Sequence, residues 1–412
     1  MTFGEMDLLE VFGVKESYKL PDAIMDRLFS DRCVETLAEI RKSGITNIRD
    51  YYQEEQGDRK KLKQDFTPDG ICRIVSGMML DGDFLDICAG TGALTKAAVE
   101  AGHRVIHEQE YSERTIAFSL LEACLNGMTG VIERADCLRG TVQNRYELHR
   151  SGAISIPKEV LVRAEKKKYR NVIMNPPYSM KFPDAGEYEF FGMKVPKSKA
   201  DYGFVLQGLR HLEDDGRLIA ILPHGVLFRG QKEEAIRKWL VQNRLVNAVI
   251  GLPNNMFLNT GIPVFILVLQ RGSEDTLFID ASKEFQKDGK VNIMTPDQIR
   301  KVMDIFRMRI EVERYSHIAS QEEMQENGYN LNIPRYVDTY IQEPLPDVKT
   351  LLNDLEQLQA EEDETCRELI GMLQNLRADS EEGNRAIGKH IEVLQKSIRK
   401  KPEIKGQMEM DL

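Results

Sequence analysis

The chain has 412 residues, of which 42% are hydrophobic, 30% are charged and 7% are aromatic. This is the composition of an ordinary globular protein, and it excludes a disordered chain and a collagen-like one. The formal net charge of −10 comes from 56 basic and 66 acidic residues. It excludes a protein that coats nucleic acid with its whole surface but leaves room for a local basic groove.

The cysteines and the apolar runs bear on where the protein works. Its six cysteines are scattered without a CxxC pair, so we expect no zinc site, no other metal and no disulfide framework. No apolar run approaches the roughly 20 residues that span a bilayer. The N-terminal segment lacks a basic region followed by an apolar one. We therefore expect a cytoplasmic protein with no membrane contact.

The pattern of apolar residues predicts four parts. Residues 1–62 form a helical N-terminal extension, residues 63–272 an α/β domain, residues 273–344 a mixed continuation and residues 345–412 a helical tail. Within the extension, one amphipathic helix is expected over 21–42. Its apolar residues recur at helical spacing: Ile24, Leu28, Val34, Leu37 and Ile40.

The α/β domain shows short β-branched runs that alternate with helical stretches, which is typical of parallel strands joined by crossover helices. The predicted strands are 84–88, 104–110, 131–135, 171–175, 217–223, 246–252 and 263–269. The predicted helices are 94–100, 112–128, 199–212 and 232–243. Seven strands in this order suit one doubly wound sheet.

The tail contains an apolar stripe over residues 348–376. Glu362 and Gln359 interrupt it, and fewer than about four clean heptads is weak evidence for a coiled coil. We therefore predict a helix that packs on its own domain. Four residues share one seven-residue register: Val348, Leu355, Leu369 and Leu376.

A glycine-rich turn follows the first predicted strand. Glycines there let the backbone approach a ligand closely, and the following helix N-terminus favours negative charge. The dinucleotide pattern GxGxxG is incomplete, because Thr95 stands at its third glycine. The candidate ligand-binding residues of this turn are Asp86, Cys88, Ala89, Gly90, Thr91, Gly92 and Ala93.

Acidic residues end the next two predicted strands. The second strand ends in Glu108-Gln109-Glu110, about twenty residues beyond the glycines, where a carboxylate can accept both ribose hydroxyls of a nucleoside. Asp136 closes the third strand, where a carboxylate or the nearby backbone can meet an adenine edge. Each acid alone is more often a helix cap or a turn residue. Together, at consecutive strand ends, they favour a nucleoside cofactor.

A second motif, Asn175-Pro176-Pro177-Tyr178, follows the fourth predicted strand. The prolines fix the backbone and remove two donors, so the Asn175 amide oxygen and the Pro176 carbonyl remain as acceptors. Such a pair can grip an exocyclic amino group, and Tyr178 offers a flat face on which a flipped base can stack. The plain alternative is a rigid turn after a strand.

Together, these two motifs resemble the S-adenosylmethionine-dependent amino-methyltransferases of the γ arrangement, in which the cofactor motif precedes the catalytic one. More closely, the chain resembles the modification (M) subunits of type I restriction-modification systems, which are N6-adenine DNA methyltransferases. The resemblance spans about residues 60–340. Its most specific parts are the downstream blocks 198–204, 222–230, 236–240, 250–253, 261–263 and 329–336.

The resemblance implies a class I methyltransferase fold, with the last strand of a parallel sheet reversed by the 246–269 hairpin and helical extensions at both ends. It implies S-adenosylmethionine as the cofactor, held at the ribose by Glu110. The implied reaction flips an adenine out of duplex DNA, holds its N6 amine between Asn175 and Pro176, and methylates it. The segment that folds over the cofactor's methionine end would comprise Gln64, Phe66, Thr67 and Pro68.

The resemblance also implies partners. Double-stranded DNA is the substrate, and lysines of the cluster 194–199 are placed to position phosphates. No stretch after Leu269 looks like a target-recognition domain, so a separate specificity (S) subunit is expected, docked on the helix over 348–376. A restriction (R) subunit and a second M copy are further candidates. The family usually carries a larger helical domain before the cofactor segment than the sixty residues present here.

Two alternatives stay open. One is an amino-methyltransferase that acts on a protein glutamine or on RNA, since those families also use Asn-Pro-Pro-Tyr; the blocks over 198–263 argue against it. The other is a DNA-binding assembly subunit that has lost catalysis, against which the intact Asn175 and Tyr178 speak.

Overall fold

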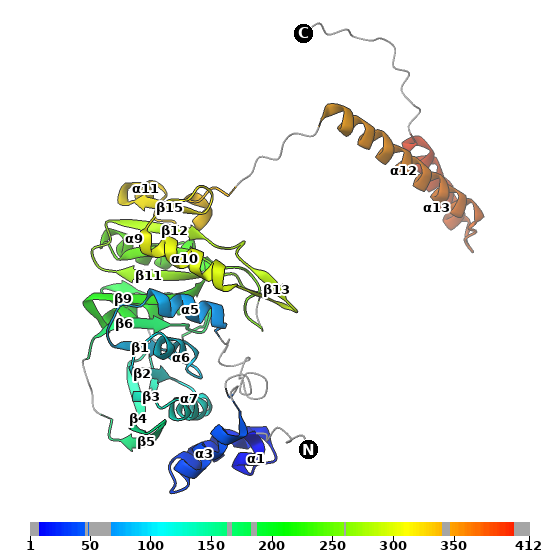
Figure 1. Cartoon of the computed structure of the whole chain (residues 1–412). Helices are drawn as coiled ribbons and strands as arrows, with labels where there is room; N and C mark the ends of the chain where they lie inside the picture. The colour runs from blue at the N-terminus through cyan, green and yellow to red at the C-terminus, as the bar shows by residue number, and fades with distance from the viewer. Residues whose placement is uncertain are drawn as a thin grey trace. The chain divides into compact units, whose positions relative to one another are not determined.

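The computed structural model describes residues 8–45, 48, 67–162, 167–182, 188–258, 261–339 and 347–398. The chain divides into two compact units, Met1–Thr339 and Tyr340–Leu412 (Figure 1). This division is coarser than the four parts expected from the sequence, which remain a prediction. Among the described helices, none combines the length and the hydropathy that a bilayer span requires.

Eleven strands of the first unit form one sheet in the order β15-β12-β10-β11-β9-β6-β1-β2-β3-β4-β5. Seven of them (β1, β2, β3, β6, β9, β10 and β11) overlap the predicted strands. β11 runs antiparallel to both of its neighbours, β9 and β10, which confirms the predicted reversed strand in a doubly wound α/β sheet. The bounds are β1 Phe84–Ile87, β2 Val105–Glu110, β3 Thr129–Asp136, β4 Thr141–Ser151, β5 Ile154–Val160, β6 Tyr169–Met174, β9 Leu212–Pro223, β10 Val246–Gly251, β11 Val264–Gln270, β12 Asp275–Asp280 and β15 Ser316–Ser320.

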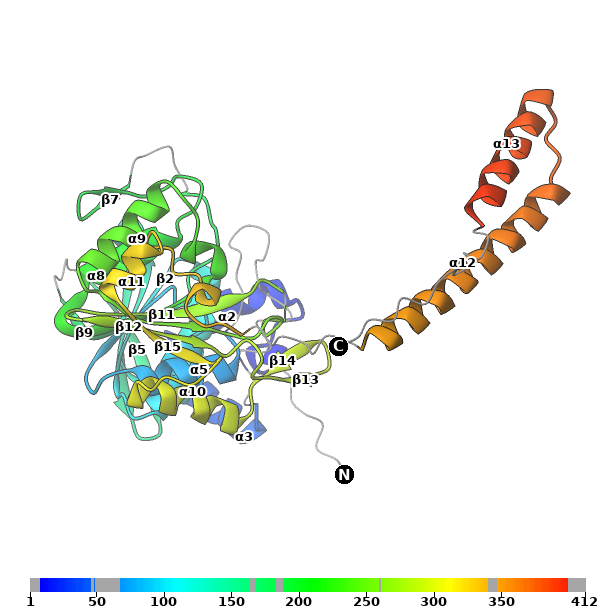
Figure 2. The same cartoon turned by 90° about the horizontal axis from the view of Figure 1, so that it is seen from above.

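Helices cover both faces of this sheet, and each face has its own apolar core (Figure 2). Because β11 is covered on both sides, it is an unbroken apolar run, buried from Val264 to Leu269. One face carries α1 Leu8–Phe12, α2 Leu20–Leu28, α3 Cys33–Ser43, α5 Asp69–Met78, α6 Ala93–Glu100, α7 Glu113–Leu125 and α10 Pro296–Met308. The other carries α8 Asp201–Arg210, α9 Lys232–Gln242 and α11 Gln321–Glu326.

The long connection expected over 138–170 folds instead as the antiparallel strands β4 and β5, which extend the sheet beyond β3. β12, parallel to β10, and β15, antiparallel to β12, extend the other end of the sheet. These four strands escaped prediction because they lie near the edges, where polar and apolar residues mix and no long apolar run marks the strand. Two short hairpins complete the unit: β7 Glu189–Phe190 with β8 Met193–Lys194, and β13 Gln286–Asp288 with β14 Val291–Ile293.

The prediction of a single amphipathic helix over 21–42 is wrong, because α2 and α3 are separate helices. The Ser30 hydroxyl donates to the Arg27 carbonyl and accepts from the Arg32 backbone N–H, which closes a turn between them. The turn shifts the helical phase, so Val34 is 49% exposed while Cys33 is buried in its place.

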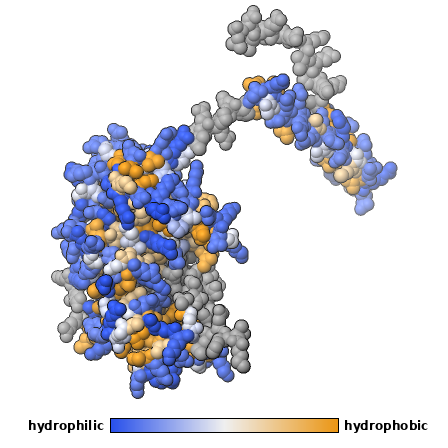
Figure 3. Space-filling view, in the orientation of Figure 1, coloured by the Kyte–Doolittle hydropathy of each residue, from blue (hydrophilic) through white to orange (hydrophobic). Residues whose placement is uncertain are grey.

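The second unit is a pair of helices, α12 Val348–Asn375 and α13 Glu381–Ser397, and α12 matches the predicted helix. Within α12 only Ile370 is buried, so the predicted apolar stripe lies largely on the surface of this unit (Figure 3). Its exposed members are Val348, Leu351, Leu352, Leu355, Leu358, Leu369, Met372 and, just beyond the helix, Leu376.

Candidate active site

The candidate site lies at one edge of the sheet, where the parallel strands β1, β2, β3 and β6 end. Ile87 at the end of β1 pairs with Gln109 of β2 on one side and with Met174 of β6 on the other. The residues that follow these strands therefore meet at the same edge. This brings the glycine-rich turn, Glu110 and Asn175 together although they are far apart in the sequence.

The turn between β1 and α6 depends on left-handed backbone conformations. Cys88, Gly90 and Gly92 have φ angles of 62°, 61° and 81°, and Gly92 is the N-cap of α6. A Cβ atom on Gly92 would stand 3.0 Å from Glu108 Oε1, whereas a Cβ on Gly90 would meet nothing within 4 Å. Gly90 therefore borders open space, where a ligand can approach the backbone.

Glu110 joins the end of β2 to this turn. Its Oε2 accepts the Gly90 backbone N–H at 3.0 Å, and its Oε1 accepts that of Ser112 at 2.8 Å. Burial raises the pKa of Glu110 against the effect of these hydrogen bonds. Each carboxylate oxygen has a second lone pair, so Glu110 can hold the turn and still accept a hydroxyl.

Asp86 and Thr91 each present a polar oxygen without a hydrogen-bond partner among the described residues. The Thr95 hydroxyl donates to Asp86 Oδ2 at 2.8 Å, while Asp86 Oδ1 and Thr91 Oγ1 are buried and unsatisfied. Burial, together with the nearby carboxylates of Glu108 and Glu110, raises the pKa of Asp86 well above its ordinary value. Because buried polar atoms normally find a partner, these two oxygens favour a polar ligand here.

Asn175 is held by residues on both sides. Its Nδ2 donates to Thr67 Oγ1 at 2.8 Å, and its Oδ1 accepts the Tyr178 hydroxyl at 2.7 Å. The Tyr178 ring is buried and packs edge-to-face on Phe257, with ring centroids 6.0 Å apart. Thr67, which was predicted for the cofactor segment, thus directly contacts the predicted catalytic motif.

The remaining predicted residues fall around this centre. Pro68 is the N-cap of α5, directly after Thr67. Pro176 is buried and Pro177 half-buried. Gln64 and Phe66 lie outside the described residues.

The comparisons with known proteins agree with this geometry. A model of the N-6 DNA methylase family matches residues 48–344. The chain belongs to this family. The predicted family resemblance is therefore confirmed.

Several relatives of the chain are named as methylase subunits. The chain is 26% identical to the type I restriction enzyme MpnII methylase subunit of Mycoplasma pneumoniae over 367 residues, which cover 83% of this chain and 66% of that protein. It is 27% identical to the MjaVII methylase subunit of Methanocaldococcus jannaschii, covering 76% of this chain and 56% of that one. The chain thus spans less than two thirds of the length of either relative.

Solved structures extend the likeness to the fold. The type I restriction-modification methyltransferase subunit from Streptococcus thermophilus is 30% identical, with a TM-score of 0.60, and the match covers 80% of this chain and 79% of that one. The EcoKI M protein, at 15% identity and a TM-score of 0.51 over 93% of this chain and 92% of that one, shares the fold. The predicted class I methyltransferase fold is confirmed.

An ion pair between a fully buried aspartate and a partly buried arginine holds the chain directly after the predicted catalytic motif. Asp201 is fully buried; its Oδ1 accepts the Ser179 backbone N–H at 2.8 Å, and its Oδ2 pairs with Arg229 Nη1 at 3.1 Å. Arg229 also donates to the Ser179 hydroxyl at 3.1 Å and pairs with Glu233 at 3.3 Å. We call Ser179, Asp201 and Arg229 the clamp.

Sequence reasoning missed the clamp, although Asp201 and Arg229 stand in the blocks 198–204 and 222–230 that carry the family resemblance. A charged residue in the middle of such a block is a signal for a buried partner.

Asp136, at the end of β3, and Cys88, in the glycine-rich turn, each have a nearby partner. Asp136 Oδ1 accepts the Arg139 backbone N–H at 3.1 Å, so the carboxylate also acts as a turn cap. A hydrogen bond with the Cys137 thiol, together with burial, raises the pKa of the Cys88 thiol well above its ordinary value. Cys88 therefore stays protonated and serves as a contact rather than a nucleophile.

The buried carboxyl of Glu108 predicts a pH-dependent stability. Burial raises its pKa from 4.5 to about 7, although the Ser119 hydroxyl donates to it. The folded state therefore binds more protons than the unfolded state between pH 4.5 and 7, and the free energy of unfolding falls as the pH rises through this range, by up to about 3 kcal/mol from this group.

The Glu108→Gln variant removes the titration and should flatten that slope, measured as urea unfolding of both proteins at pH 5 and pH 8. Parallel pH profiles for the two proteins would contradict the assignment.

Proposed function

We propose that the chain transfers a methyl group from S-adenosylmethionine to N6 of adenine in double-stranded DNA, as the modification subunit of a type I-like restriction-modification system. The observation that carries this proposal is the placement of Asn175, held between Thr67 and Tyr178 beside the glycine-rich turn. Its support is membership of the N-6 DNA methylase family and the 30% identity to a type I methyltransferase subunit.

The residues at the edge of the sheet fit S-adenosylmethionine. Gly90 borders open space, and Asp86 Oδ1 and Thr91 Oγ1 are buried acceptors that lack partners among the described residues. The amino group and the ribose hydroxyls of the cofactor are donors that match such oxygens. The proposed binding residues are Gln64, Phe66, Thr67, Pro68, Asp86, the turn from Cys88 to Ala93, Glu110 and Asp136.

When bound, S-adenosylmethionine supplies an electrophilic methyl group on its sulfur. Asn175 Oδ1 and the Pro176 carbonyl accept the two hydrogens of the adenine amine, which directs the nitrogen lone pair toward that methyl group. Tyr178 stacks on the flipped base, and Pro177 keeps the backbone rigid. The amine loses its proton to water after transfer, so no general base is needed, and positioning supplies most of the rate enhancement.

The test is methyl transfer from labelled S-adenosylmethionine to adenine-containing duplex DNA, by the purified chain alone and with the product of its neighbouring gene. Label in N6-methyladenine after digestion of the DNA is the expected result. Transfer only with the neighbour's product identifies a subunit that borrows its specificity, and transfer by the chain alone identifies a self-sufficient enzyme. Label in protein or RNA instead, or in nothing, would overturn the proposal in favour of one of its two alternatives.

The proposed assembly places a specificity subunit on the exposed apolar stripe of α12. A stripe of this kind is typical of a protein-protein contact. A restriction subunit and a second copy of the chain are further proposed members. We place the assembly in the cytoplasm.

The stripe leads to a direct prediction. The double substitution Leu355→Asp with Leu369→Asp should weaken the complex with the neighbour's product about 100-fold or more, because burying the two leucines in the proposed interface contributes roughly 3 kcal/mol or more. Both side chains are about half exposed in the unit itself, so the helices should still form. Co-purification and analytical ultracentrifugation measure the effect, with Gln374→Asp on the same helix as the control. Equal binding by all three proteins would exclude this stripe as the docking site.

A further inference from the structure

The hairpin of β13 and β14 stands apart from the central sheet. It forms its own two-stranded antiparallel sheet, with Gln286 opposite Ile293 and Asp288 opposite Val291. Gly289, at φ +58°, and Lys290 make the two-residue turn at its tip. Both ribbon views show the hairpin projecting beyond the rest of its unit (Figures 1 and 2). Its side chains from Gln286 to Lys290 are all exposed.

The base of the hairpin is fixed beside the candidate site. Asn292 donates its backbone N–H to the Asn255 carbonyl at 2.8 Å and its side-chain amide to the Asn254 carbonyl at 2.7 Å. These carbonyls belong to the loop after β10, and Phe257 of the same loop packs on Tyr178. The hairpin is thus one short loop away from the ring proposed to stack on the target base.

A second contact ties the hairpin to the cofactor side of the site. Met294, directly after β14, lies against Gly70, where an added Cβ would stand 3.6 Å from the Met294 Cβ. Gly70 is in the first turn of α5, two residues after Pro68. The hairpin is therefore anchored both to the start of α5 and to the loop after β10, which lie on two sides of Asn175. This gives its tip a fixed position relative to the proposed reacting atoms.

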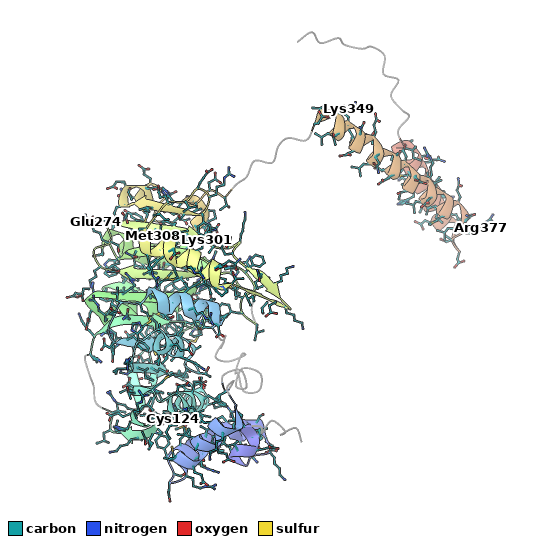
Figure 4. All side chains as sticks on the ribbon, in the orientation of Figure 1. Cys124, Glu274, Lys301, Met308, Lys349 and Arg377 are labelled. Atoms are coloured by element: carbon teal, nitrogen blue, oxygen red, sulfur yellow. The ribbon has the colours of Figure 1, made fainter. Side chains whose placement is uncertain are left out.

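The hairpin carries local positive charge on a chain whose net charge is −10. Lys283, Lys287 and Lys290 are exposed, and no ion pair joins any of them to another described residue. Glu284 at the base is already paired with Lys301 of α10 at 2.5 Å; Lys301 is labelled in Figure 4. Asp288 is then the one acidic side chain that opposes these three lysines between residues 283 and 293.

We propose that this hairpin is a DNA-contacting arm, in which Lys287 and Lys290 bind backbone phosphates of the duplex beside the flipped adenine. The inference rests on the proposed function and names the surface that grips the substrate. A two-stranded β-ribbon has the width that the major groove of B-DNA admits. Lysines on such a ribbon position the protein through phosphates without reading sequence.

The test uses the full chain with its neighbour's product, S-adenosylhomocysteine and a fluorescent 30-base-pair duplex. Fluorescence anisotropy is recorded in KCl from 50 to 200 mM. In the Lys287→Gln/Lys290→Gln variant, the slope of log affinity against log salt should become shallower by about 1.8, since each lost phosphate contact removes about 0.9. The DNA affinity should fall roughly tenfold or more, while cofactor affinity and the melting temperature stay unchanged.

Two controls sharpen the result. Lys42→Gln/Lys158→Gln removes the same charge from exposed positions on α3 and β5, and it should leave the slope unchanged. Lys287→Arg/Lys290→Arg should restore the wild-type slope. If the wild type binds and methylates DNA but the glutamine variant keeps the wild-type slope, the hypothesis of a DNA-contacting arm is wrong and the proposed function is unaffected. If the glutamine variant loses binding to the neighbour's product and keeps its affinity for DNA, the hypothesis of a DNA-contacting arm is also wrong. A wild type that neither binds nor methylates DNA overturns the proposed function and the arm with it.

Discussion

The Asn175→Ala enzyme is expected to transfer methyl groups at least about 100-fold more slowly than the wild type, the range seen when one oriented group that acts on the reacting centre is removed. The substitution deletes the oxygen proposed to accept a hydrogen from the adenine amine. It also leaves Thr67 Oγ1 and the Tyr178 hydroxyl without their shared partner. Single-turnover transfer measures the effect, because it reports the chemical step without product release.

Binding should be spared in this variant. Asn175 is half-buried. It bonds Thr67 among the proposed cofactor residues, but the bonds of Glu110 to Gly90 and of Asp86 to Thr95 do not involve it, so cofactor affinity and subunit assembly should stay within a few-fold of wild type. Tyr178→Phe is the matched control: it removes the hydroxyl that Asn175 accepts but keeps the ring, and it should slow transfer far less than Asn175→Ala. Transfer by Asn175→Ala at more than about a third of the wild-type rate would mean that the catalytic group is elsewhere.

The parts of the fold that the sequence predicts are those where burial dictates the residue pattern. β6 and β11 lie between two apolar cores, and their apolar runs, 172–174 in β6 and 264–269 in β11, mark them as strands. β4 has partners on both sides yet reads Thr-Val-Gln-Asn-Arg-Tyr, because it lies near the edge of the sheet and its polar residues can reach solvent or ion-pair partners. The break between α2 and α3 depends on one serine that closes a turn, which a search for helical periodicity passes over.

The candidate site, like the fold, could be predicted from the sequence only in part. Strand ends and motif residues follow from local sequence, so Glu110, Asp136 and Asn175 could be proposed as candidates from the sequence. Their partners could not, since the bond from Asn175 to Thr67 joins residues 108 positions apart and depends on how α5 enters the fold. The roles of Glu108 and Glu110 are likewise separated only by geometry: one carboxylate lies buried behind Gly92, and the other reaches Gly90.

The clamp leads to the second large effect. Arg229→Met should lower the free energy of unfolding by about 3 to 5 kcal/mol, because it leaves Asp201 and Glu233 as buried carboxylates without their shared cation. Protonation relieves that cost, so the difference in stability between variant and wild type should shrink as the pH falls from 8 to 5.5. Arg229→Lys keeps the charge but not the forked geometry, and should recover part of the stability.

The clamp should also affect transfer beyond its effect on stability. Ser179 adopts a left-handed backbone conformation, at φ 49°, one residue after Tyr178, and both Asp201 and Arg229 hold it there. At a temperature where the Arg229→Met variant is fully folded by circular dichroism, loosening this residue should lower kcat tenfold or more, since misplaced reacting groups lose effective concentration. KM for S-adenosylmethionine should hardly change, because the clamp and the glycine-rich turn share no hydrogen bond identified among the described residues. A folded variant with wild-type kcat would show that the clamp serves stability alone and that the predicted catalytic motif is rigid without it.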